Sequence, residues 1–387
     1  MDSRKHIVFT AEHLSLGGAE VVLTQYLQVI DPNKYKISMI MRDDLGEKNY
    51  LLPRIPSHVQ IKTVFSSADL ARFKKEKGFF AKRRYKNALV AGFRQALQEL
   101  GTVDLVIDFI PVLNRFLSSF KDYRMILWMH AQKSHMPKWE RFKYFLRMRK
   151  YEQIVLISEE MKAQFIGYFP SIRDKFTVIY NPFDFDRINK LAIDESELSE
   201  ADRALMQKDY VVSVGRLVPA KDFATIVEAA KILKDRGMTY THYFLGAGEF
   251  RNALQKQIDA YGLSQHVLLL GQKNNPYIWL KRAKFFVHSA LREGLPTVVI
   301  ESMILARPVI ASACPVGPRE ILENGKCGAL YDVGDAQGLA NQIERLLKDE
   351  KLGETFVQKA SERVQIFHSS KVLPKFYNYI DTLLEKP

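Results

Sequence analysis

Two glutamates eight residues apart, Glu293 and Glu301, are the pair best suited to binding chemistry in this sequence. Between them, Pro296 is predicted to be the first residue of a helix, because a proline loses no intrahelical hydrogen bond there. Glu293 then lies in the loop before the helix and Glu301 just over one turn inside it. The backbone N–H groups left free at this start belong to Leu295, Thr297 and Val298. Carboxylates suit sugar hydroxyls and a helix start suits phosphate, so the stretch is suited to a sugar diphosphate. The alternative is an ordinary helix start with one cap-like acid and one surface acid.

A second candidate lies in the loop that follows a strand predicted over residues 210–214. Arg216 and Lys221 place two cations at the carboxyl end of that strand, where they suit a diphosphate. Gly246 follows the next predicted strand, residues 243–245, and precedes a helix.

A glycine pair, Gly17 and Gly18, separates the first predicted strand from the first helix. Glycines at such a junction let a ligand approach the backbone, and the helix start favours anions. The pattern is not the GxGxxG of dinucleotide-binding proteins, which disfavours a dehydrogenase. A simple tight turn explains the pair equally well.

His130 directly follows the apolar run of residues 125–129, which places it at the carboxyl edge of a predicted sheet. Ligands bind at that edge in parallel α/β sheets. A lone histidine is more often structural, but His130 is a candidate for the reacting centre, and His135 is a weaker one.

The elements that position these residues alternate between strand and helix along the whole chain, which predicts doubly wound parallel sheets. Its 387 residues are enough for two domains, and 47% apolar with 26% charged residues indicates a globular protein. Asn181-Pro182 breaks the pattern and marks the boundary between the domains. No apolar run reaches the roughly 18 residues that span a bilayer, and no signal-peptide core is present. The two cysteines form no metal or disulfide pattern, so reduced thiols in a cytosolic protein are expected.

The net charge of +13 is concentrated in two segments that mix cations with aromatic residues. Residues 72–86 hold eight basic residues against one acidic, and residues 138–150 hold six against one. The second segment has the spacing of an amphipathic helix, which favours contact with an anionic membrane. The residues expected to make this contact are Lys82, Arg83, Arg84, Trp139 and Arg141. A core-facing stripe with a solvated basic face is the alternative, and a nucleic-acid binder would show similar charge.

Taken together in this order and spacing, these motifs resemble the retaining glycosyltransferases of family four, the glycosyl transferases group 1. The matching residues are Gly17-Gly18-Ala19-Glu20, His130, the linker 178–182, Gly215-Arg216 with Lys221, Gly246-Ala247-Gly248, and Glu293 with Glu301. The run 313–322 looks like the branch that builds bacterial surface polysaccharides, lipopolysaccharide and lipid-linked oligosaccharides. Glu-Gly-Leu-Pro stands where many members have Glu-Gly-Phe-Gly or Glu-Gly-Phe-Pro, a departure that leaves the acidic pair intact.

The resemblance implies a role for each matched position. Arg216 and Lys221 would neutralise the nucleotide diphosphate without a metal or other cofactor. Glu293 would bind donor-sugar hydroxyls and Glu301 the ribose, with Leu295, Pro296 and Thr297 at the helix start completing the donor site. Gly246 and Gln272 would border the base, and Gly17 and Gly18 would let a helix start close over the phosphates. His130 would lie by the reacting carbon and the acceptor, so His130 and Glu293 are the catalytic candidates.

The resemblance also implies the GT-B fold, with two facing Rossmann-like domains of parallel sheets. Residues 1–182 would bind the acceptor, residues 183–368 the nucleotide sugar, and residues 369–387 would form a helix crossing back to the first domain. The expected activity is transfer of a hexosyl or N-acetylhexosaminyl group from a nucleotide-sugar donor, expected to be a UDP-sugar, to a lipid-linked, lipopolysaccharide or capsular glycan acceptor. The protein would be cytoplasmic and peripheral on the inner face of the plasma membrane, with no nucleic acid as partner.

Three other functions share parts of this pattern. A sugar-nucleotide epimerase has the same fold and would turn over its substrate without an acceptor. A nucleic-acid binder would use the charge, although no recognised nucleic-acid motif is present. A non-catalytic sugar- or lipid-binding protein would bind a donor without releasing its nucleotide.

Overall fold

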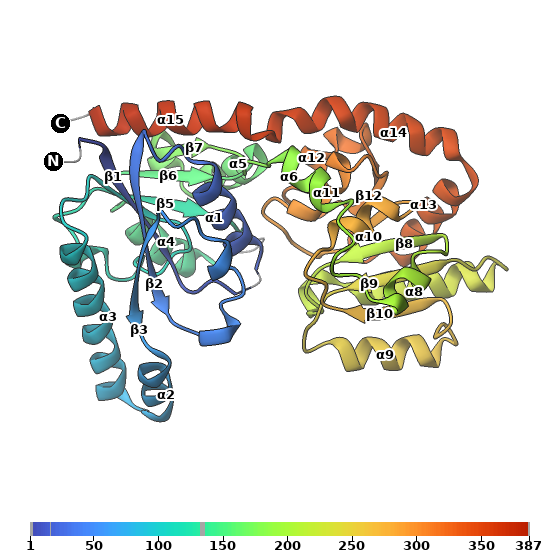
Figure 1. Cartoon of the computed structure of the whole chain (residues 1–387), viewed down its shortest axis with the longest axis horizontal. Coiled ribbons are helices and arrows are strands. Elements are labelled where there is room, and N and C mark those ends of the chain that lie inside the picture. Colours follow the sequence, from blue (N-terminus) through green and yellow to red (C-terminus); the bar gives the residue numbers. More distant parts are fainter. Residues whose placement is uncertain (1–2, 16, 132–135, 386–387) are drawn as a thin grey trace. The chain divides into compact units, whose positions relative to one another are not determined.

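The chain forms two compact units in a computed structural model, which describes residues 3–15, 17–131 and 136–385 (Figure 1). The first unit consists of Met1–Phe183 together with Ser369–Pro387, and the second is Asp184–His368. The first junction falls one residue after the sequence-based boundary, and the second coincides with it.

The first unit is built on a seven-stranded parallel sheet in the order β3-β2-β1-β4-β5-β6-β7. The strands are β1 (Lys5–Ala11), β2 (Tyr35–Asp43), β3 (Gln60–Phe65), β4 (Leu105–Asp108), β5 (Met125–Met129), β6 (Gln153–Leu156) and β7 (Phe176–Val178). Its helices are α1 (Gly18–Val29), α2 (Ser67–Lys75), α3 (Phe79–Glu99), α4 (Lys138–Met148), α5 (Glu159–Tyr168) and α15 (Ser369–Glu385).

The second unit is built on a six-stranded parallel sheet in the order β10-β9-β8-β11-β12-β13. The strands are β8 (Tyr210–Val214), β9 (Thr241–Leu245), β10 (Val267–Gly271), β11 (Phe286–His288), β12 (Val309–Ser312) and β13 (Ala329–Tyr331). Its helices are α6 (Phe185–Leu191), α7 (Glu200–Leu205), α8 (Phe223–Asp235), α9 (Arg251–Ala260), α10 (Tyr277–Arg282), α11 (Thr297–Ile304), α12 (Pro318–Ile321), α13 (Ala336–Lys348) and α14 (Glu350–Arg363).

Both sheets are parallel because helical segments connect nearly all successive strands, as the alternating pattern predicts. Their strands are continuous apolar runs rather than alternating ones, since helices bury both faces. In β1, for example, Ile7, Val8 and Phe9 are all fully buried. The order of strands reverses beside β1 in the first sheet and beside β8 in the second, and such switch points open a crevice at the carboxyl edge.

The last helix, α15, packs on the first unit, as the predicted fold requires. It buries Val372, Phe376, Ile380 and Leu383 along one side. Phe376 lies against Tyr26 and Trp128, with ring centroids 5.4 and 6.1 Å away. At the edge of this contact, Lys34 and Tyr35 donate hydrogen bonds to the Asp381 carboxylate at 2.6 and 2.5 Å.

The starts of α3 and α11 position residues that the sequence analysis singles out, and the second differs from the prediction. The helix α3 begins at Phe79, so three cations of the first basic segment, Lys82, Arg83 and Arg84, lie in its first turns. Gly78 precedes it with a φ of 96°, a left-handed conformation that glycine adopts without strain. The helix of residues 297–304 begins one residue after Pro296, which is its N-cap.

Replacing Phe376 by alanine should lower the free energy of unfolding of the first unit by about 3–5 kcal/mol, because it empties a buried aromatic site. Urea unfolding followed by tryptophan fluorescence measures this loss, in a background in which Trp139 and Trp279 are replaced by phenylalanine so that only Trp128, beside Phe376, reports. Lys375→Ala, an exposed change on the same helix, should shift the transition by less than about 0.5 kcal/mol. Equal shifts for the two variants would mean that α15 is not docked through this face.

Candidate functional site

The predicted donor residues of the second unit lie on loops that follow adjacent parallel strands. Arg216 and Lys221 follow β8, Gly246 follows β9, Gln272 follows β10, and Glu293 follows β11. Because parallel strands end at one edge of a sheet, the fold brings these loops to that edge.

The Glu293 carboxylate is held by two side chains, one from the loop after β8 and one from the last residue of β11. The Lys221 ammonium contacts its Oε1 atom, and Nε2 of His288 lies 3.1 Å from the same oxygen. The Lys221 and Glu293 side chains are 25% and 13% exposed, and that of His288 is only 4% exposed. The residues predicted to bind diphosphate and sugar separately, Lys221 and Glu293, are therefore an ion pair in this structure.

This pairing keeps Glu293 ionised. Burial by itself would raise the pKa of the carboxyl group, but the charge of Lys221 and the hydrogen bond from His288 outweigh burial and lower the pKa to about 2. Burial also lowers the pKa of His288. The hydrogen bond and charge of Glu293 oppose this shift and the Lys221 charge adds to it, but burial prevails. At neutral pH the site thus holds a carboxylate anion beside a neutral imidazole.

Glu301 lies in the opposite environment. It is the fifth residue of α11, as predicted, but it is only 4% exposed, so the alternative of a surface acid is wrong. The Tyr277 hydroxyl lies 3.4 Å from its Oε1 atom. Burial raises the pKa of Glu301 to about 7, against a smaller opposing effect of that tyrosine.

The start of α11 stands directly after Glu293. Leu295 and Pro296 are buried, whereas Thr297 is half-buried at the first helical position. The N–H groups of Thr297 and Val298 lie in the first turn, where an α-helix provides no intrahelical acceptors. An anion near Glu293 would meet the positive end of this helix.

Gly246 has a structural reason for being glycine. Its φ is 147°, and a Cβ atom there would lie 1.9 Å from the carbonyl oxygen of Gly215. Its N–H donates to the Gly271 carbonyl at 2.8 Å, while the Gly215 N–H donates to the Leu245 carbonyl at 2.9 Å. Gly246 therefore lets the loops after β8, β9 and β10 pack backbone to backbone.

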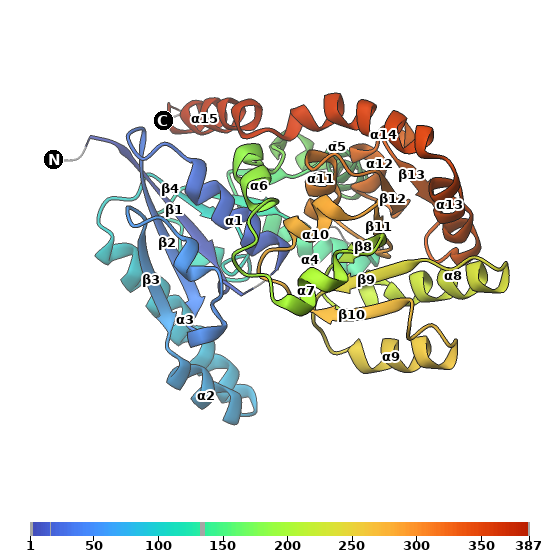
Figure 2. The same ribbon diagram turned by 45° about the vertical axis from the view of Figure 1, so that its right-hand side comes forward.

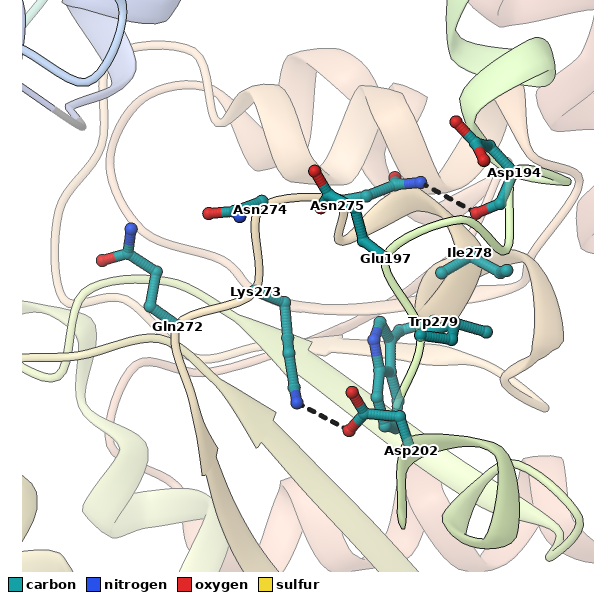
Figure 3. Close-up of a pocket in the computed structure, with 10 residues that line it drawn as sticks. Asp194, Glu197, Asp202, Gln272, Lys273, Asn274, Asn275, Ile278 and Trp279 are labelled. Atoms are coloured by element: carbon teal, nitrogen blue, oxygen red, sulfur yellow. Dashed lines mark hydrogen bonds and ion pairs between the residues drawn. The ribbon is translucent and has the colours of Figure 1, made fainter. Parts of the chain in front are cut away.

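Gln272 lines a cavity of about 330 Å³ beside the end of β10 (Figure 3). Lys273 spans one side, with its ammonium 2.6 Å from Asp202, and the Asn275 amide reaches the Asp194 carbonyl at 3.4 Å. The complete lining is Asp194, Glu197, Leu198, Asp202, Gln272, Lys273, Asn274, Asn275, Ile278 and Trp279. The loop before α7 forms the acidic wall, which the sequence did not indicate.

Arg216 differs from its predicted partner Lys221. Its side chain is exposed and makes no ion pair or hydrogen bond with another residue in the part of the chain that the structure describes. It is therefore a cation open to an anionic ligand.

The predicted residues of the first unit lie at the carboxyl edge of its own sheet. Gly17 is the N-cap of α1, and a Cβ atom there would meet the Glu20 carboxylate at 2.1 Å, whereas the space around Gly18 is open. His130 follows β5 and lies against Phe109, with ring centroids 4.4 Å apart. Burial lowers the pKa of His130 to about 3, although a Phe109 backbone group opposes this shift, so its imidazole is neutral at pH 7. His135 lies outside the described residues.

The two basic segments differ in structure. Lys82, Arg83 and Arg84 are exposed at the start of α3, beside Phe79 and Phe80, which are 73% and 72% exposed. Figures 1 and 2 show this start of α3 beside α2, at the end of the first unit opposite α15. Arg84 forms an ion pair with Glu76 at 2.9 Å.

On α4, Trp139 and Phe142 are 63% and 62% exposed, so this stripe does not face the core at these positions. Arg141 is half-buried: it donates to the Met136 carbonyl at 2.7 Å and lies over the Tyr168 ring. Among the described residues, no helix is both long enough and apolar enough to cross a membrane.

Sequence reasoning missed two residues of the site, His288 and Tyr277. His288 ends an apolar run, which is the same signal that selected His130, but nothing in the sequence pairs it with Glu293. Tyr277 follows a proline at the start of a short helix and carries no motif. Their place in the site is evident only from tertiary contacts, those of His288 with Glu293 and of Tyr277 with Glu301.

A sequence profile of the glycosyl transferases group 1 family matches residues 194–363, within the second unit. The second unit is therefore a domain of this family. An uncharacterized glycosyltransferase of Methanocaldococcus jannaschii is 30% identical over 254 residues, which cover 62% of this chain and 61% of that protein. A Campylobacter jejuni alpha-1,4-N-acetyl-D-galactosaminyltransferase that acts on a diphospho-undecaprenol-linked glycan is 25% identical over 384 residues, 97% of this chain and 98% of that protein.

The chain spans only 53–63% of the length of three curated relatives that it matches. Among solved structures, that of Anabaena HepE in complex with UDP and glucose has a TM-score of 0.78 at 20% identity, covering 97% of this chain and 99% of that one. This likeness shows a shared fold and confirms the predicted GT-B class, with two Rossmann-like domains.

Replacing Glu301 by glutamine should make the unliganded protein more stable at alkaline pH. The folded-state pKa of about 7 lies above the ordinary 4.5, so the contribution of Glu301 to stability is fully present below pH 4.5 and is lost as pH rises through 7. Wild type should therefore lose about 3 kcal/mol relative to Glu301→Gln between pH 4.5 and 8. Urea unfolding across this range measures the difference. Glu362→Gln, which removes an exposed carboxylate of α14, should follow the wild-type curve, and a parallel curve for Glu301→Gln would contradict the burial.

Proposed function

We propose that this chain, whose second unit is a group 1 glycosyl transferase domain, is a retaining glycosyltransferase. It transfers a hexosyl or N-acetylhexosaminyl group from a UDP-sugar to a lipid-linked, lipopolysaccharide or capsular glycan acceptor. The observation that carries this proposal is Glu293, held as an anion by Lys221 and His288 directly before the start of α11. A fixed carboxylate beside a helix start suits a ligand with hydroxyls at one end and phosphate next to them.

The leaving group in this proposal is the nucleotide diphosphate. Arg216, which is exposed, and Lys221 neutralise the charge that develops as the bond from the sugar to the phosphate breaks, and the first turn of α11 adds backbone N–H groups. These cations do the work that a metal ion does in other transferases. The acceptor hydroxyl attacks the same face that the phosphate leaves, and the departing phosphate takes its proton, so the configuration is retained without a protein nucleophile.

The nucleoside extends from this point toward Glu301 and Gln272. A ribose diol donates hydrogen bonds to the ionised Glu301 carboxylate, and Gln272 with the Gly246 turn borders the base. The cavity beside Gln272 is of the size that proteins use for ligand groups.

The acceptor belongs to the first unit in this proposal. Gly18 is open at the start of α1, and the neutral His130 stands at the same sheet edge, where it can accept or donate a hydrogen bond to an acceptor hydroxyl. Support for a lipid-linked acceptor comes from the Campylobacter jejuni relative, whose name gives a glycan on diphospho-undecaprenol as its substrate.

A lipid-linked acceptor requires access to a membrane, and the first unit has suitable surfaces. The exposed Phe79 and Phe80 at the start of α3 are surrounded by cations of α2 and α3, and α4 adds Trp139 and Phe142. Aromatic side chains insert at the headgroup level, while cations attract anionic lipids. We place the protein in the cytoplasm, peripheral on the inner face of the plasma membrane.

Titration calorimetry with UDP and with a panel of UDP-sugars tests the donor site. Wild type should bind UDP, and Arg216→Ala should weaken binding by about 10- to 100-fold, since a charge-assisted hydrogen bond contributes about 1.5–3 kcal/mol. Arg236→Ala, which removes a cation of the same domain that pairs with Glu344, is the matched control and should bind UDP as wild type does. No UDP binding by wild type would refute the proposal, and turnover of a UDP-sugar without acceptor would indicate an epimerase.

Sedimentation with vesicles tests the membrane surface. Lys82 and Arg83 have no ionic partner among the described residues, whereas Arg84 is paired with Glu76. Neutralising all three with glutamine should therefore remove about 2 kcal/mol, or roughly 30-fold in binding to anionic vesicles, at about 1 kcal/mol for each free cation. The charge-matched triple change of Lys326, Lys351 and Lys359 to glutamine, in the second unit, should have little effect. Equal binding of wild type to neutral and anionic vesicles would count against this surface.

A further inference from the structure

Neither the sequence motifs nor membership of the family gives His288 a role. It is the last residue of β11, which pairs with β12 in the middle of the second sheet. Its side chain is 4% exposed, and its Nε2 atom lies 3.1 Å from Oε1 of Glu293. A buried histidine at a sheet edge is thus aimed at the carboxylate of the donor site.

The chemistry of the two groups fixes the proton. Glu293 is ionised and can only accept a hydrogen bond, so the imidazole must donate through Nε2–H. The other ring nitrogen, Nδ1, is buried and has no hydrogen-bond partner among the described residues. A buried nitrogen without a partner costs about 1–3 kcal/mol of stability.

The backbone that carries His288 and Glu293 is held from several sides. The Tyr331 hydroxyl donates to the His288 carbonyl at 3.2 Å, and the Ser312 hydroxyl donates to the Ala290 carbonyl at 2.7 Å. The Ser289 hydroxyl and the Leu291 N–H reach the Lys221 and Ala220 carbonyls at 2.7 and 3.0 Å. Two loops are therefore locked together around the carboxylate.

Lys221 and His288 both contact Oε1 of Glu293, so this oxygen has two polar partners. No hydrogen bond to Oε2 occurs within the described residues. We propose that His288 is a positioning residue, which together with Lys221 fixes the Glu293 carboxylate by one oxygen and presents the other to the hydroxyls of the donor sugar.

This inference rests on the proposed function and narrows it. His288 hydrogen-bonds to Glu293, which is assigned to the sugar, whereas Arg216, Lys221 and Glu301 are assigned to the nucleotide. Loss of the His288 hydrogen bond should therefore weaken the sugar-dependent step and leave binding of UDP alone unchanged. A purely structural histidine would affect both equally.

The test compares wild type with His288→Gln, which keeps an N–H donor, and His288→Leu, which keeps the volume but not the donor. His242→Leu is the matched control, because His242 is also buried in this sheet, on β9, and contacts Ser213 rather than Glu293. We expect His288→Leu to bind UDP within about twofold of wild type but to lower kcat/KM for the UDP-sugar by about 10- to 100-fold, the effect of one hydrogen bond to a charged group. His288→Gln should restore most of this loss, and His242→Leu should retain the wild-type ratio of sugar turnover to UDP binding.

Unchanged sugar turnover in His288→Leu, or an equal loss of UDP binding and turnover, would overturn the inference. Failure of wild type to bind UDP would instead refute the proposed function. The hydrogen bond itself is tested without any ligand: imidazole 15N shifts of His288 should show the Nε2–H tautomer at pH 7 in wild type. The Nδ1–H tautomer in wild type would show that the imidazole does not donate to Glu293, which also overturns the inference.

Discussion

The ion pair between Lys221 and Glu293 is the interaction on which the candidate site of the second unit depends. A mostly buried carboxylate requires a partner, because removal of one member of such a pair leaves a charge without solvent or counter-charge. Lys221 ends the loop after β8, and Glu293 stands in the loop after β11, so the pair joins two segments that are 72 residues apart in sequence. The same loops are joined by the backbone contacts of Leu291 with Ala220 and by the Ser289 hydroxyl. Contacts within the protein itself therefore organise this edge of the second sheet.

The two glutamates of the candidate site have the same side chain but opposite pKa shifts, because their surroundings in the fold differ. Glu293 meets a cation and a histidine and has a pKa of about 2, whereas Glu301 meets one tyrosine hydroxyl and has a pKa of about 7. Divergent pKa values in one site often indicate a general acid and base. Here each value has a local cause that suits binding: a permanent anion next to cations, and a buried carboxyl that ionises readily when a ligand donates to it.

The sequence predicts the fold well because the physical signals are strong: buried parallel strands are continuous apolar runs, and helical segments separate nearly all of them. The order of Arg216, Lys221, Glu293 and Glu301 also predicts which sheet edge carries the candidate site. The exact ends of helices are harder to predict: Pro296 is an N-cap instead of the first helical residue. The roles of the histidines are hardest to predict from the sequence, since His130 and His288 both follow apolar runs. Only the tertiary structure reveals that one lies against Phe109 and the other against Glu293.

The place of α15 in the chain has a consequence for how the protein is made. The first unit is interrupted by residues 184–368, and the chain returns where the Ser369 N–H donates to the Phe183 carbonyl at 2.9 Å. During synthesis, Tyr26 and Trp128 therefore cannot contact Phe376 until the entire second unit has been synthesised. Domains generally fold as units during synthesis, and exposed apolar surface in incomplete ones promotes aggregation. The first unit therefore cannot complete its core before the second unit has been synthesised, and the open cluster of Tyr26 and Trp128 is the surface that chaperones would need to shield.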